Sequence, residues 1–555
     1  MKTRLILALA LAFAGIQAMA QDFSKLIDRQ DVYVFRSKPS DIHGRFNNPG
    51  PSFVIFPDAR TTKEDAEQFI QSSGIQSIID GYTGSVYFVN PMGAKYDNAA
   101  DFNWYKSFIS RLRIVTNLKV VGIGNGATFV DETIAHNACN VAGIVSINSK
   151  ASAKAASGES PVPAYVIGKN AQRTAAAYIA RDKAALCEKS GKTALYVNKE
   201  EDLLRLYVNA ADVKDPASVI ADAWDKVLSW NYRFNNTGHT WYTGESYGEH
   251  GDSELVPFVV FDRLGIKRNV VVDNIGSGEY LWYEYLPEAA QNAADGTVPL
   301  VVLLHGNNND PRTQAETAGF LHLASQEGFM VVEMEWQGNG YAVMGHDGIE
   351  SVVYELFNRY PQIDRSRVYA EGLSAGAFNA TALGIKKSHL FAAVGAQSGG
   401  LFGANRFGAS RGAIMDEAAQ KAGAVQMPYF SISGIADEVV PFVSPMQKGP
   451  NFIHYAWQAY QLMNGLPVVE TLDFSADEVF GLALENRQRV MTNKGIAYHV
   501  GDLCKDGVPL VRIVGVENYG HWNFQPGAKL MWEYFKMFSR DVNTKKLIVC
   551  PDQQK

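Results

Sequence analysis

The 555-residue chain is poor in cysteine and in clustered charge, and each lack excludes a class of protein. Its net charge is −7, and the charged residues are spread without long runs, so we expect no nucleic-acid partner. After the first twenty residues no run of 18 apolar residues occurs, so we expect no membrane span. The four cysteines show no C-x-x-C spacing, so we expect no metal site. A globular protein remains.

The first twenty residues have the pattern of a secretory signal peptide. Lys2 and Arg4 form a basic start, and Leu5–Ile16 is an apolar run. Ala18-Met19-Ala20 is a cleavage site of the A-x-A type, so the mature chain is expected to begin at Gln21. The sequence therefore predicts an exported protein, in the periplasm or outside the cell, and leaves its oligomeric state open.

Export makes disulfide bonds an option for the four cysteines, Cys139, Cys187, Cys504 and Cys550. Three sets of two pairs are open from the sequence. The simplest set joins the two cysteines of each half of the chain. We therefore expect the pairs Cys139–Cys187 and Cys504–Cys550.

Short apolar runs alternate with helical patterns in the second half of the chain. Strands separated in this way favour a mostly parallel sheet with helices on both faces. Two earlier runs, Asn269–Asp273 and Tyr280–Leu286, are typical of an antiparallel edge pair. The predicted strands that follow are Val298–Leu304, Phe329–Met334, Arg367–Ala370, Ala392–Ala396 and Tyr429–Ser433.

The first half repeats this pattern, with a constant offset of 250 residues around one turn. Gly122 then falls on Gly372, Gly124 on Ser374, and Ala142 on Ala392. Such correspondence indicates an internal duplication. The sequence therefore predicts two tandem α/β domains, at residues 21–265 and 266–555.

The turn of the second half is a G-x-S-x-G motif, at residues 372–376. A predicted strand precedes it and a helix with small residues follows. This context is that of a nucleophile elbow, in which flanking glycines allow a tight turn that exposes the serine hydroxyl. Ser374 is therefore the predicted nucleophile, and the alternative is a structural turn. Gly124 holds the same place in the first half and offers no attacking atom.

A serine nucleophile requires a base and an acid that orients the base. Asp437 follows the strand Tyr429–Ser433 in a tight loop and is the predicted acid, with Glu438 as its rival. His521 lies in a loop before the last predicted helix and is the predicted base. The other histidines after Ser374 are His389, His454 and His499. In the first half, Gly238-His239 corresponds to Gly520-His521, as a residual base or an ordinary loop residue.

Acyl transfer also requires donors for a developing oxyanion. One predicted donor is the backbone N–H of Ala375, directly after the nucleophile. The other is the backbone N–H of Asn307, in the loop after strand Val298–Leu304. Trp336, Gln397 and Trp522 are candidate substrate contacts, and a core position is the alternative for each tryptophan.

These motifs together resemble the α/β-hydrolase superfamily, and within it the polyhydroxybutyrate depolymerase and feruloyl esterase group. The motifs that carry the resemblance are Leu303-Leu304-His305-Gly306, Ile363-Asp364 with Arg367-Val368-Tyr369, Gly372-Leu373-Ser374-Ala375-Gly376-Ala377 and Gly520-His521. The resemblance covers about residues 270–540 and is faint before them. It implies a carboxylic ester hydrolase that uses neither a metal ion nor an organic cofactor.

Three functions are consistent with these features. The first is a serine esterase that acts on polyester, feruloyl or acetyl-sugar esters, as small molecules or polymers. The second is a peptidase with the same triad, because a triad does not define the leaving group. The third is a binding protein in which both halves serve recognition, and the full Ser–Asp–His order counts against it. The first half is expected to be catalytically inactive by this mechanism.

Overall fold

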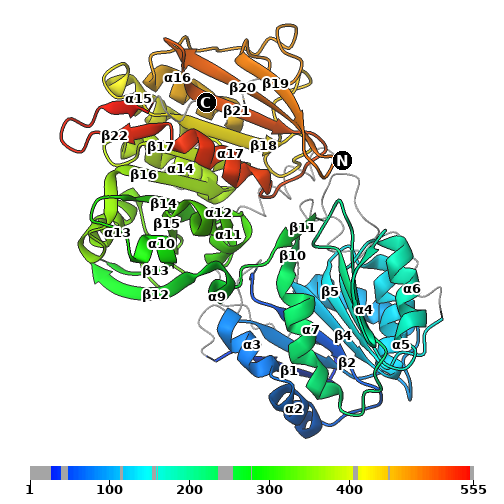
Figure 1. The fold of residues 1–555 in the computed structure, drawn as a ribbon. Coiled ribbons are helices and arrows are strands. Elements are labelled where there is room, and N and C mark those ends of the chain that lie inside the picture. Colours follow the sequence, from blue (N-terminus) through cyan, green and yellow to red (C-terminus); the bar gives the residue numbers. More distant parts are fainter. Residues whose placement is uncertain are drawn as a thin grey trace.

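The computed structural model describes residues 27–38, 48–112, 117–152, 158, 160–234, 254–276, 278–403, 410–447 and 451–550. The expected signal peptide lies outside the described residues, as does Gly238-His239. Figure 1 shows two bodies, one built by the first half of the chain and one by the second. Each contains one large, mostly parallel sheet with helices on both faces, so the predicted fold class is confirmed.

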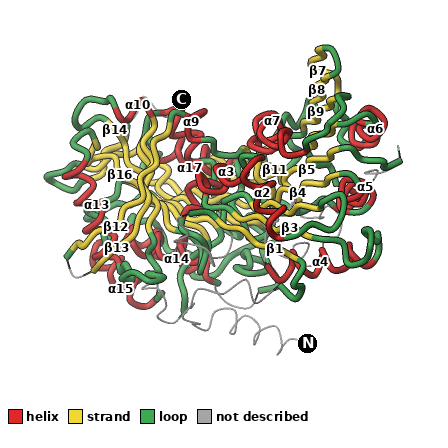
Figure 2. The backbone as a smooth tube through the Cα atoms, turned by 90° about the horizontal axis from the view of Figure 1, so that it is seen from below, coloured by secondary structure: helices red, strands yellow, loops and turns green. Residues whose placement is uncertain are grey.

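The sheet of the first half has nine strands in the order β1-β3-β2-β4-β5-β6-β9-β8-β7. Its strands are β1 (Val32–Arg36), β2 (Ser52–Phe56), β3 (Ser85–Val89), β4 (Leu118–Ile123), β5 (Val141–Ile147), β6 (Ala164–Ile167), β7 (Ala185–Ser190), β8 (Thr193–Val197) and β9 (Arg205–Asn209). The six central strands, β3-β2-β4-β5-β6-β9 in spatial order, run parallel to one another. Strand β1 at one edge and the β7–β8 hairpin at the other pair in antiparallel fashion. This hairpin projects from the body in Figure 2.

Helices cover both faces of this first sheet. One apolar layer contains side chains of α2 (Lys63–Ser72), α3 (Ile75–Tyr82) and α7 (Ile220–Lys226). The opposite layer contains side chains of α4 (Ala100–Leu112), α5 (Asn125–Glu132) and α6 (Ala171–Arg181). The central strands are buried on both faces, which explains their continuous apolar sequences. A small hairpin of β10 (Asn231–Phe234) and β11 (Glu254–Pro257), then α9 (Phe261–Leu264), leads to the second half.

The sheet of the second half has ten strands in the order β12-β13-β15-β14-β16-β17-β18-β21-β20-β19. The first two form the expected antiparallel edge pair. The strands are β12 (Ile266–Ile275), β13 (Gly278–Pro287), β14 (Val298–Leu304), β15 (Met330–Met334), β16 (Ile363–Leu373), β17 (Ala393–Gln397), β18 (Tyr429–Gly434), β19 (Glu485–Met491), β20 (Ala497–Lys505) and β21 (Val508–Val516). A short pair, β22 (Phe538–Arg540) and β23 (Leu547–Val549), lies apart from this sheet.

The helices of the second half also form two layers. One apolar layer includes α13 (His346–Arg359), α14 (Ala375–Lys386), α15 (Arg411–Lys421) and α16 (Phe452–Met463). The other includes α11 (Arg312–Thr317), α12 (Phe320–Glu327) and α17 (Pro526–Phe535). The short helix α10 (Glu288–Gln291) follows β13. In Figure 1, α11 and α12 lie on the side of the second half that faces the first.

The two sheets share one topology. Read across each sheet, the spatial order β1-β3-β2-β4-β5-β6-β9-β8-β7 corresponds strand by strand to β13-β15-β14-β16-β17-β18-β21-β20-β19. The pairing is parallel or antiparallel at the same steps in both sheets. The second sheet adds only β12. The 250-residue offset seen in the sequence therefore joins equivalent elements, β4 with β16 and β5 with β17.

The expected disulfide pairs are wrong. All four cysteines lie in the described part of the chain, and each is a thiol rather than half of a disulfide. Cys139 is buried beneath the first sheet, whereas Cys187 is exposed on the projecting strand β7. Cys504 lies on β20 and Cys550 just after β23, which pair with different strands. Equal numbers of cysteines in each half did not imply neighbouring thiols.

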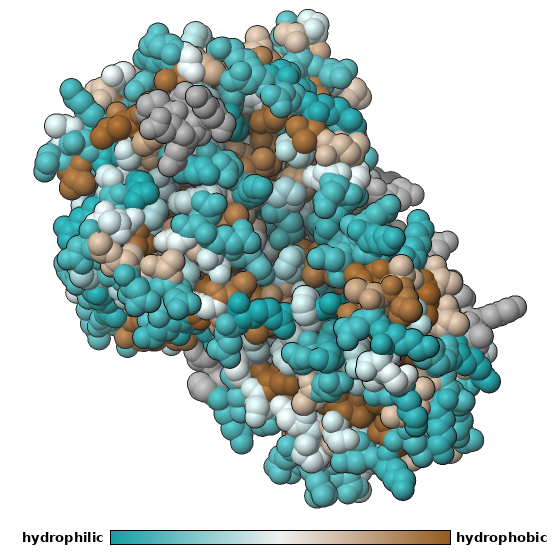
Figure 3. All heavy atoms as spheres, in the orientation of Figure 1, coloured by the Kyte–Doolittle hydropathy of each residue, from teal (hydrophilic) through white to brown (hydrophobic). Residues whose placement is uncertain are grey.

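On the face shown in Figure 3, hydrophobic residues form small separate areas among hydrophilic ones. Across the described residues, no helix combines the length and the apolar content that crossing a bilayer requires.

The turn between β4 and α5 keeps the backbone of a nucleophile elbow. Gly124 has φ 56° and ψ −111°, close to the 54° and −120° of Ser374 at the same place in the second half. A Cβ at Gly124 would lie 2.1 Å from Oδ1 of Asp58. The same oxygen accepts a hydrogen bond from the backbone N–H of Asn125 at 2.7 Å. A carboxylate therefore fills the space that a nucleophile would need.

We predict that Gly124→Ala destabilises the first half beyond the cost of its backbone conformation. Gly191 is the control for a positive φ, since its φ is 54° and no atom lies within 4 Å of a Cβ position there. Gly191→Ala should cost about 1–2 kcal/mol in unfolding free energy. Gly124→Ala should cost about 1–3 kcal/mol more, because the added methyl group overlaps Asp58. Denaturant unfolding measures both.

The Gly124→Ala, Asp58→Ala double variant tests the cause. Removal of the carboxylate should recover part of the loss, giving a coupling free energy between the two positions. Additive effects of the two substitutions would show that Asp58 is not the obstacle.

Candidate active site

The nucleophile elbow of the second half is formed by close backbone packing. A Cβ at Gly376 would lie 2.0 Å from the carbonyl oxygen of Leu304, and one at Gly372 would lie 2.4 Å from the carbonyl group of Gly376. Only glycine allows these approaches. The turn places Ser374 between β16 and α14, with its backbone N–H bonded to the carbonyl of Gln397 at 2.9 Å. The serine is 9% exposed.

Three side chains from distant parts of the chain meet at this turn. Nε2 of His521 lies 2.9 Å from Oγ of Ser374, and Nδ1 of His521 lies 2.7 Å from Oδ2 of Asp437. A carboxylate only accepts hydrogen bonds, so Nδ1 carries a proton and Nε2 of the neutral ring is left to accept from the serine hydroxyl. This is the arrangement in which an imidazole acts as base toward a hydroxyl.

The carboxylate of Asp437 is fixed by its own loop. Its Oδ1 accepts hydrogen bonds from the backbone N–H groups of Val439 and Val440, both at 2.8 Å. Its Oδ2 is thereby directed toward the imidazole. The loop itself packs closely, since a Cβ at Gly434 would lie 2.1 Å from the carbonyl oxygen of Tyr519. This glycine lets the acid loop and the histidine loop touch.

The other three histidines after the nucleophile lie elsewhere. His389 is bonded to Glu350 at 2.6 Å, and His454 on α16 to the carbonyl of Val469 at 2.8 Å. His499 on β20 is bonded to Glu517 at 2.6 Å. Among these four histidines, His521 is therefore the one that reaches the serine.

The loop that follows β14 lies beside the elbow. It starts at His305, which is buried. A Cβ placed on the next residue, Gly306, would lie 3.6 Å from the carbonyl oxygen of Leu373. The N–H of Ala375 belongs to the first turn of α14, where helix N–H groups have no partner within the helix. The predicted donors Asn307 and Ala375 thus lie on neighbouring segments, and their role in binding an oxyanion stays a prediction.

Gln337 holds this loop and was not predicted. Its Nε2 donates to Oδ1 of Asn307 at 2.9 Å, and its Oε1 accepts from the N–H of Asn308 at 2.7 Å. Asn308 has a positive φ of 56°. The only signal in the sequence is a polar residue that follows the buried strand β15, which is common at the end of any parallel strand.

Two candidate substrate contacts are engaged in the protein interior. Trp336 is 3% exposed, and its indole N–H donates to the carbonyl of His305 at 2.9 Å. Gln397 is 1% exposed, and its Nε2 donates to Oε1 of Glu371 at 3.1 Å. Trp522, beside the histidine, is also buried. Trp336 therefore holds the start of the loop that contains Asn307, and Gln397 holds the carboxyl group of Glu371.

A buried carboxyl group lies behind the elbow, three residues before the serine. Glu371 on β16 is fully buried and accepts hydrogen bonds from Gln314 at 2.7 and 2.9 Å. Burial raises the pKa of Glu371 to about 7, although the amide donors of Gln314 and Gln397 act to lower it. A carboxyl group with a pKa near neutral pH therefore lies directly behind the nucleophile elbow.

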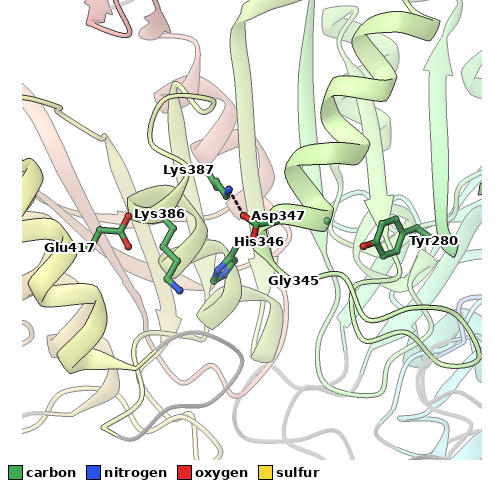
Figure 4. Close-up of a pocket in the computed structure, with 8 residues that line it drawn as sticks. Tyr280, Gly345, His346, Asp347, Lys386, Lys387 and Glu417 are labelled. Carbon is green, nitrogen blue, oxygen red and sulfur yellow. Dashed lines mark hydrogen bonds and ion pairs between the residues drawn. The ribbon is translucent and has the colours of Figure 1, made fainter. Parts of the chain in front are cut away.

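A separate cavity of about 430 Å³ lies at the far end of α14. Figure 4 shows Lys386, the last residue of this helix, and Lys387, directly after it, near the start of α13, with Lys387 paired to Asp347. Ser374 precedes the other end of α14, about 18 Å away for a helix of this length. The cavity is therefore distinct from the candidate active site.

Comparisons with known proteins agree with the motifs of the second half. Residues 281–428 match a family model described as esterase PHB depolymerase, which supports a carboxylic ester hydrolase. No curated protein matches the chain.

Several solved structures are similar to part of the chain. An acetyl xylan esterase from Aspergillus awamori is 17% identical, with a TM-score of 0.34, over 49% of this chain and 99% of its own. An S-formylglutathione hydrolase from Agrobacterium tumefaciens is 12% identical, with a TM-score of 0.33, over 49% of this chain and 96% of its own. The functional proposal below rests on the family match and the geometry.

We predict that Glu371 makes stability depend on pH. Its pKa is higher in the folded state than its ordinary value of 4.5, so its contribution is full below pH 4.5 and is lost as the pH rises to about 7. Over that interval Glu371→Gln should lose less stability than the wild type, by about 3 kcal/mol in unfolding free energy. Denaturant unfolding between pH 5 and 8, followed by tryptophan fluorescence, measures the difference.

Glu355→Gln is the control, because it removes a carboxyl group from a surface ion pair with Arg359. It should keep the pH dependence of the wild type. Identical pH dependence for Glu371→Gln and the wild type would contradict the prediction.

Proposed function

We propose that the protein is an exported serine esterase, whose catalytic domain comprises residues 266–555 and whose first domain, residues 21–265, is non-catalytic. The observation that carries this proposal is the unbroken hydrogen-bonded series Ser374–His521–Asp437 at a nucleophile elbow. The family match over residues 281–428 supports an ester as the substrate.

The proposed reaction starts with attack of Oγ of Ser374 on the ester carbonyl carbon. Nε2 of His521 takes the hydroxyl proton as the new bond forms, and then gives it to the departing alcohol. The backbone N–H groups of Ala375 and Asn307 donate to the tetrahedral oxyanion. Each such donor contributes about 10²–10³ in rate. The product of this half-reaction is an acyl group on Ser374.

Hydrolysis of the acyl group uses the same residues. A water molecule gives a proton to His521 and its oxygen attacks the acyl carbon. The second tetrahedral intermediate collapses, the proton returns to Oγ of Ser374, and the acid leaves. Asp437 keeps the ring in one orientation throughout and stabilises its positive charge. The backbone N–H groups of Val439 and Val440 hold the Asp437 carboxylate in place.

We expect the substrate among polyesters, feruloyl esters and acetylated sugars. Assays with p-nitrophenyl acetate, a methyl ferulate, an acetylated sugar, a hydroxybutyrate oligomer and a dipeptide amide separate these classes. Turnover of the dipeptide amide above that of every ester would favour the peptidase alternative instead.

We predict that Ser374→Ala lowers kcat for p-nitrophenyl acetate by roughly 10⁴–10⁶, because the attacking atom is removed. A fluorophosphonate should label the wild type at Ser374 and leave the variant unlabelled. Ser351→Ala is the matched control, since this serine lies on the exposed side of α13 and donates only to the carbonyl of Asp347. It should keep full activity. Activity retained by folded Ser374→Ala would refute the assignment.

A further inference from the structure

Helix α11 is buried on all sides although most of its residues are polar. All six residues from Arg312 to Thr317 are buried, and five of them carry a charged or hydroxyl or amide group. Buried polar groups are stable only when they are paired. The partners of this helix therefore define what it connects.

One set of partners belongs to the first half. The guanidinium group of Arg312 pairs with Asp310 at 2.6 Å and donates to the carbonyl of Tyr82 at 3.1 Å and to Oδ1 of Asn48 at 3.2 Å. Arg268, from β12, lies beside Glu316 of α11 at 3.4 Å and donates to the carbonyl of Gly81 at 3.2 Å.

The two carbonyls belong to the last turn of helix α3. Carbonyls at this end of a helix have no partner within it and carry partial negative charge. Two arginines of the second half thus cap a helix of the first half. Within the first half, the ring of Tyr82 stacks 5.9 Å from that of Phe261, and Arg268 of the second half lies over Phe261 at 4.8 Å.

The other set of partners belongs to the candidate active site. Nε2 of Gln314 donates to both oxygens of Glu371, three residues before Ser374. Oε1 of Gln314 accepts from Nδ2 of Asn523 at 2.9 Å, two residues after His521. One amide side chain therefore joins the strand of the nucleophile to the loop of the base.

A second contact ties the same loop to α11. Nε2 of Gln525 donates to the carbonyl of Thr317 at 2.5 Å. Asp310, which pairs with Arg312, belongs to the loop that starts at His305 and includes Asn307. The loop of the base thus contacts α11, and the loop of the predicted oxyanion donor leads directly into it.

We propose that the first half is a positioning module for the catalytic half: the end of α3 holds α11 through Arg312 and Arg268, and Gln314 of α11 positions the loop of His521. This inference rests on the proposed esterase function. It explains why a half without a nucleophile stays packed against an active site. Gln314 is a positioning residue, since it contacts neither the substrate nor the reacting atoms.

The direct test is Gln314→Met, which keeps the length of the side chain and removes both hydrogen-bonding atoms. We expect kcat for p-nitrophenyl acetate to fall about 10- to 100-fold, the range for a small displacement of a catalytic group, with KM changed less than twofold. Hydrogen–deuterium exchange of residues 519–525 should become faster, while the central strands keep their protection.

The second test acts at the contact between the halves. Arg268 is 17% exposed at its side chain, so Arg268→Gln should fold, and it should lower kcat about 2- to 30-fold with faster exchange in the same segment. Arg268→Lys should recover part of the loss. Arg367→Gln is the matched control, because Arg367, near the start of the central strand β16, joins Asp364 and the carbonyl of Thr297 in the same manner within the second half.

Normal kcat and normal exchange at residues 519–525 in both Gln314→Met and Arg268→Gln would overturn the proposal. An equal loss in Arg367→Gln would overturn it as well, since any lost arginine would then have the same effect. If Gln314→Met fails to fold, kcat and hydrogen–deuterium exchange of Arg268→Gln and Arg268→Lys test the proposal in its place. Absence of esterase activity and of fluorophosphonate labelling in the wild type would refute the proposed function, while the exchange measurements would still test the contact.

Discussion

The close packing of a strand-to-helix turn against the neighbouring strand is the constraint on which both halves depend. A Cβ at Gly126 would lie 2.0 Å from the carbonyl of Phe56, and one at Gly376 would lie 2.0 Å from that of Leu304. In each half, the N-cap residue two positions before this glycine has a positive φ. A serine in this conformation is strained, and such strain is retained where function requires it. A glycine there carries no such cost.

The same turn faces different groups in the two halves. In the first half, the N–H of Asn125 donates to a permanent carboxylate, that of Asp58. In the second half, the equivalent N–H belongs to Ala375. The loop residue that corresponds to Asp58 is Gly306, which has no side chain to act as an acceptor. A donor without a permanent anion is available for a transient one. The turn of the first half therefore has no attacking atom, and a carboxylate occupies the place that the proposed reaction assigns to an oxyanion.

The sequence predicted what depends on local pattern. Strand Val298–Leu304 agrees with β14 at both ends, and the offset of 250 residues identified equivalent strands, because apolar runs and glycine spacing are local signals. Asp437 and His521 were found from their places after β18 and β21, since parallel strands bring such loops to one edge. The structure brings His521 to Ser374 and Asp437 to His521, while their catalytic roles remain predictions.

What the sequence could not predict depends on contacts between distant segments. The disulfide pairs were wrong because burial of Cys139 and exposure of Cys187 are properties of the fold. The polar composition of Arg312–Thr317 is typical of an exposed helix, and only the packing of the two halves shows it buried. Likewise, Gln337 and Asp58 are ordinary polar residues after strands until their partners are known. Tertiary pairing, not local propensity, gives these residues their roles.

The duplication and the polar helix together account for the asymmetry between the halves. A turn filled by its own carboxylate cannot serve as a second active site, so the first half has to be explained by the surfaces it presents. The last carbonyls of its α3 have no partner within the helix, and they accept hydrogen bonds from Arg312 and Arg268 of the second half. Breaking these bonds would leave the guanidinium groups of Arg312 and Arg268 with fewer acceptors, which is costly for a charged group in the interior. The same pairs that stabilise the contact thus give the active-site loops a fixed neighbour.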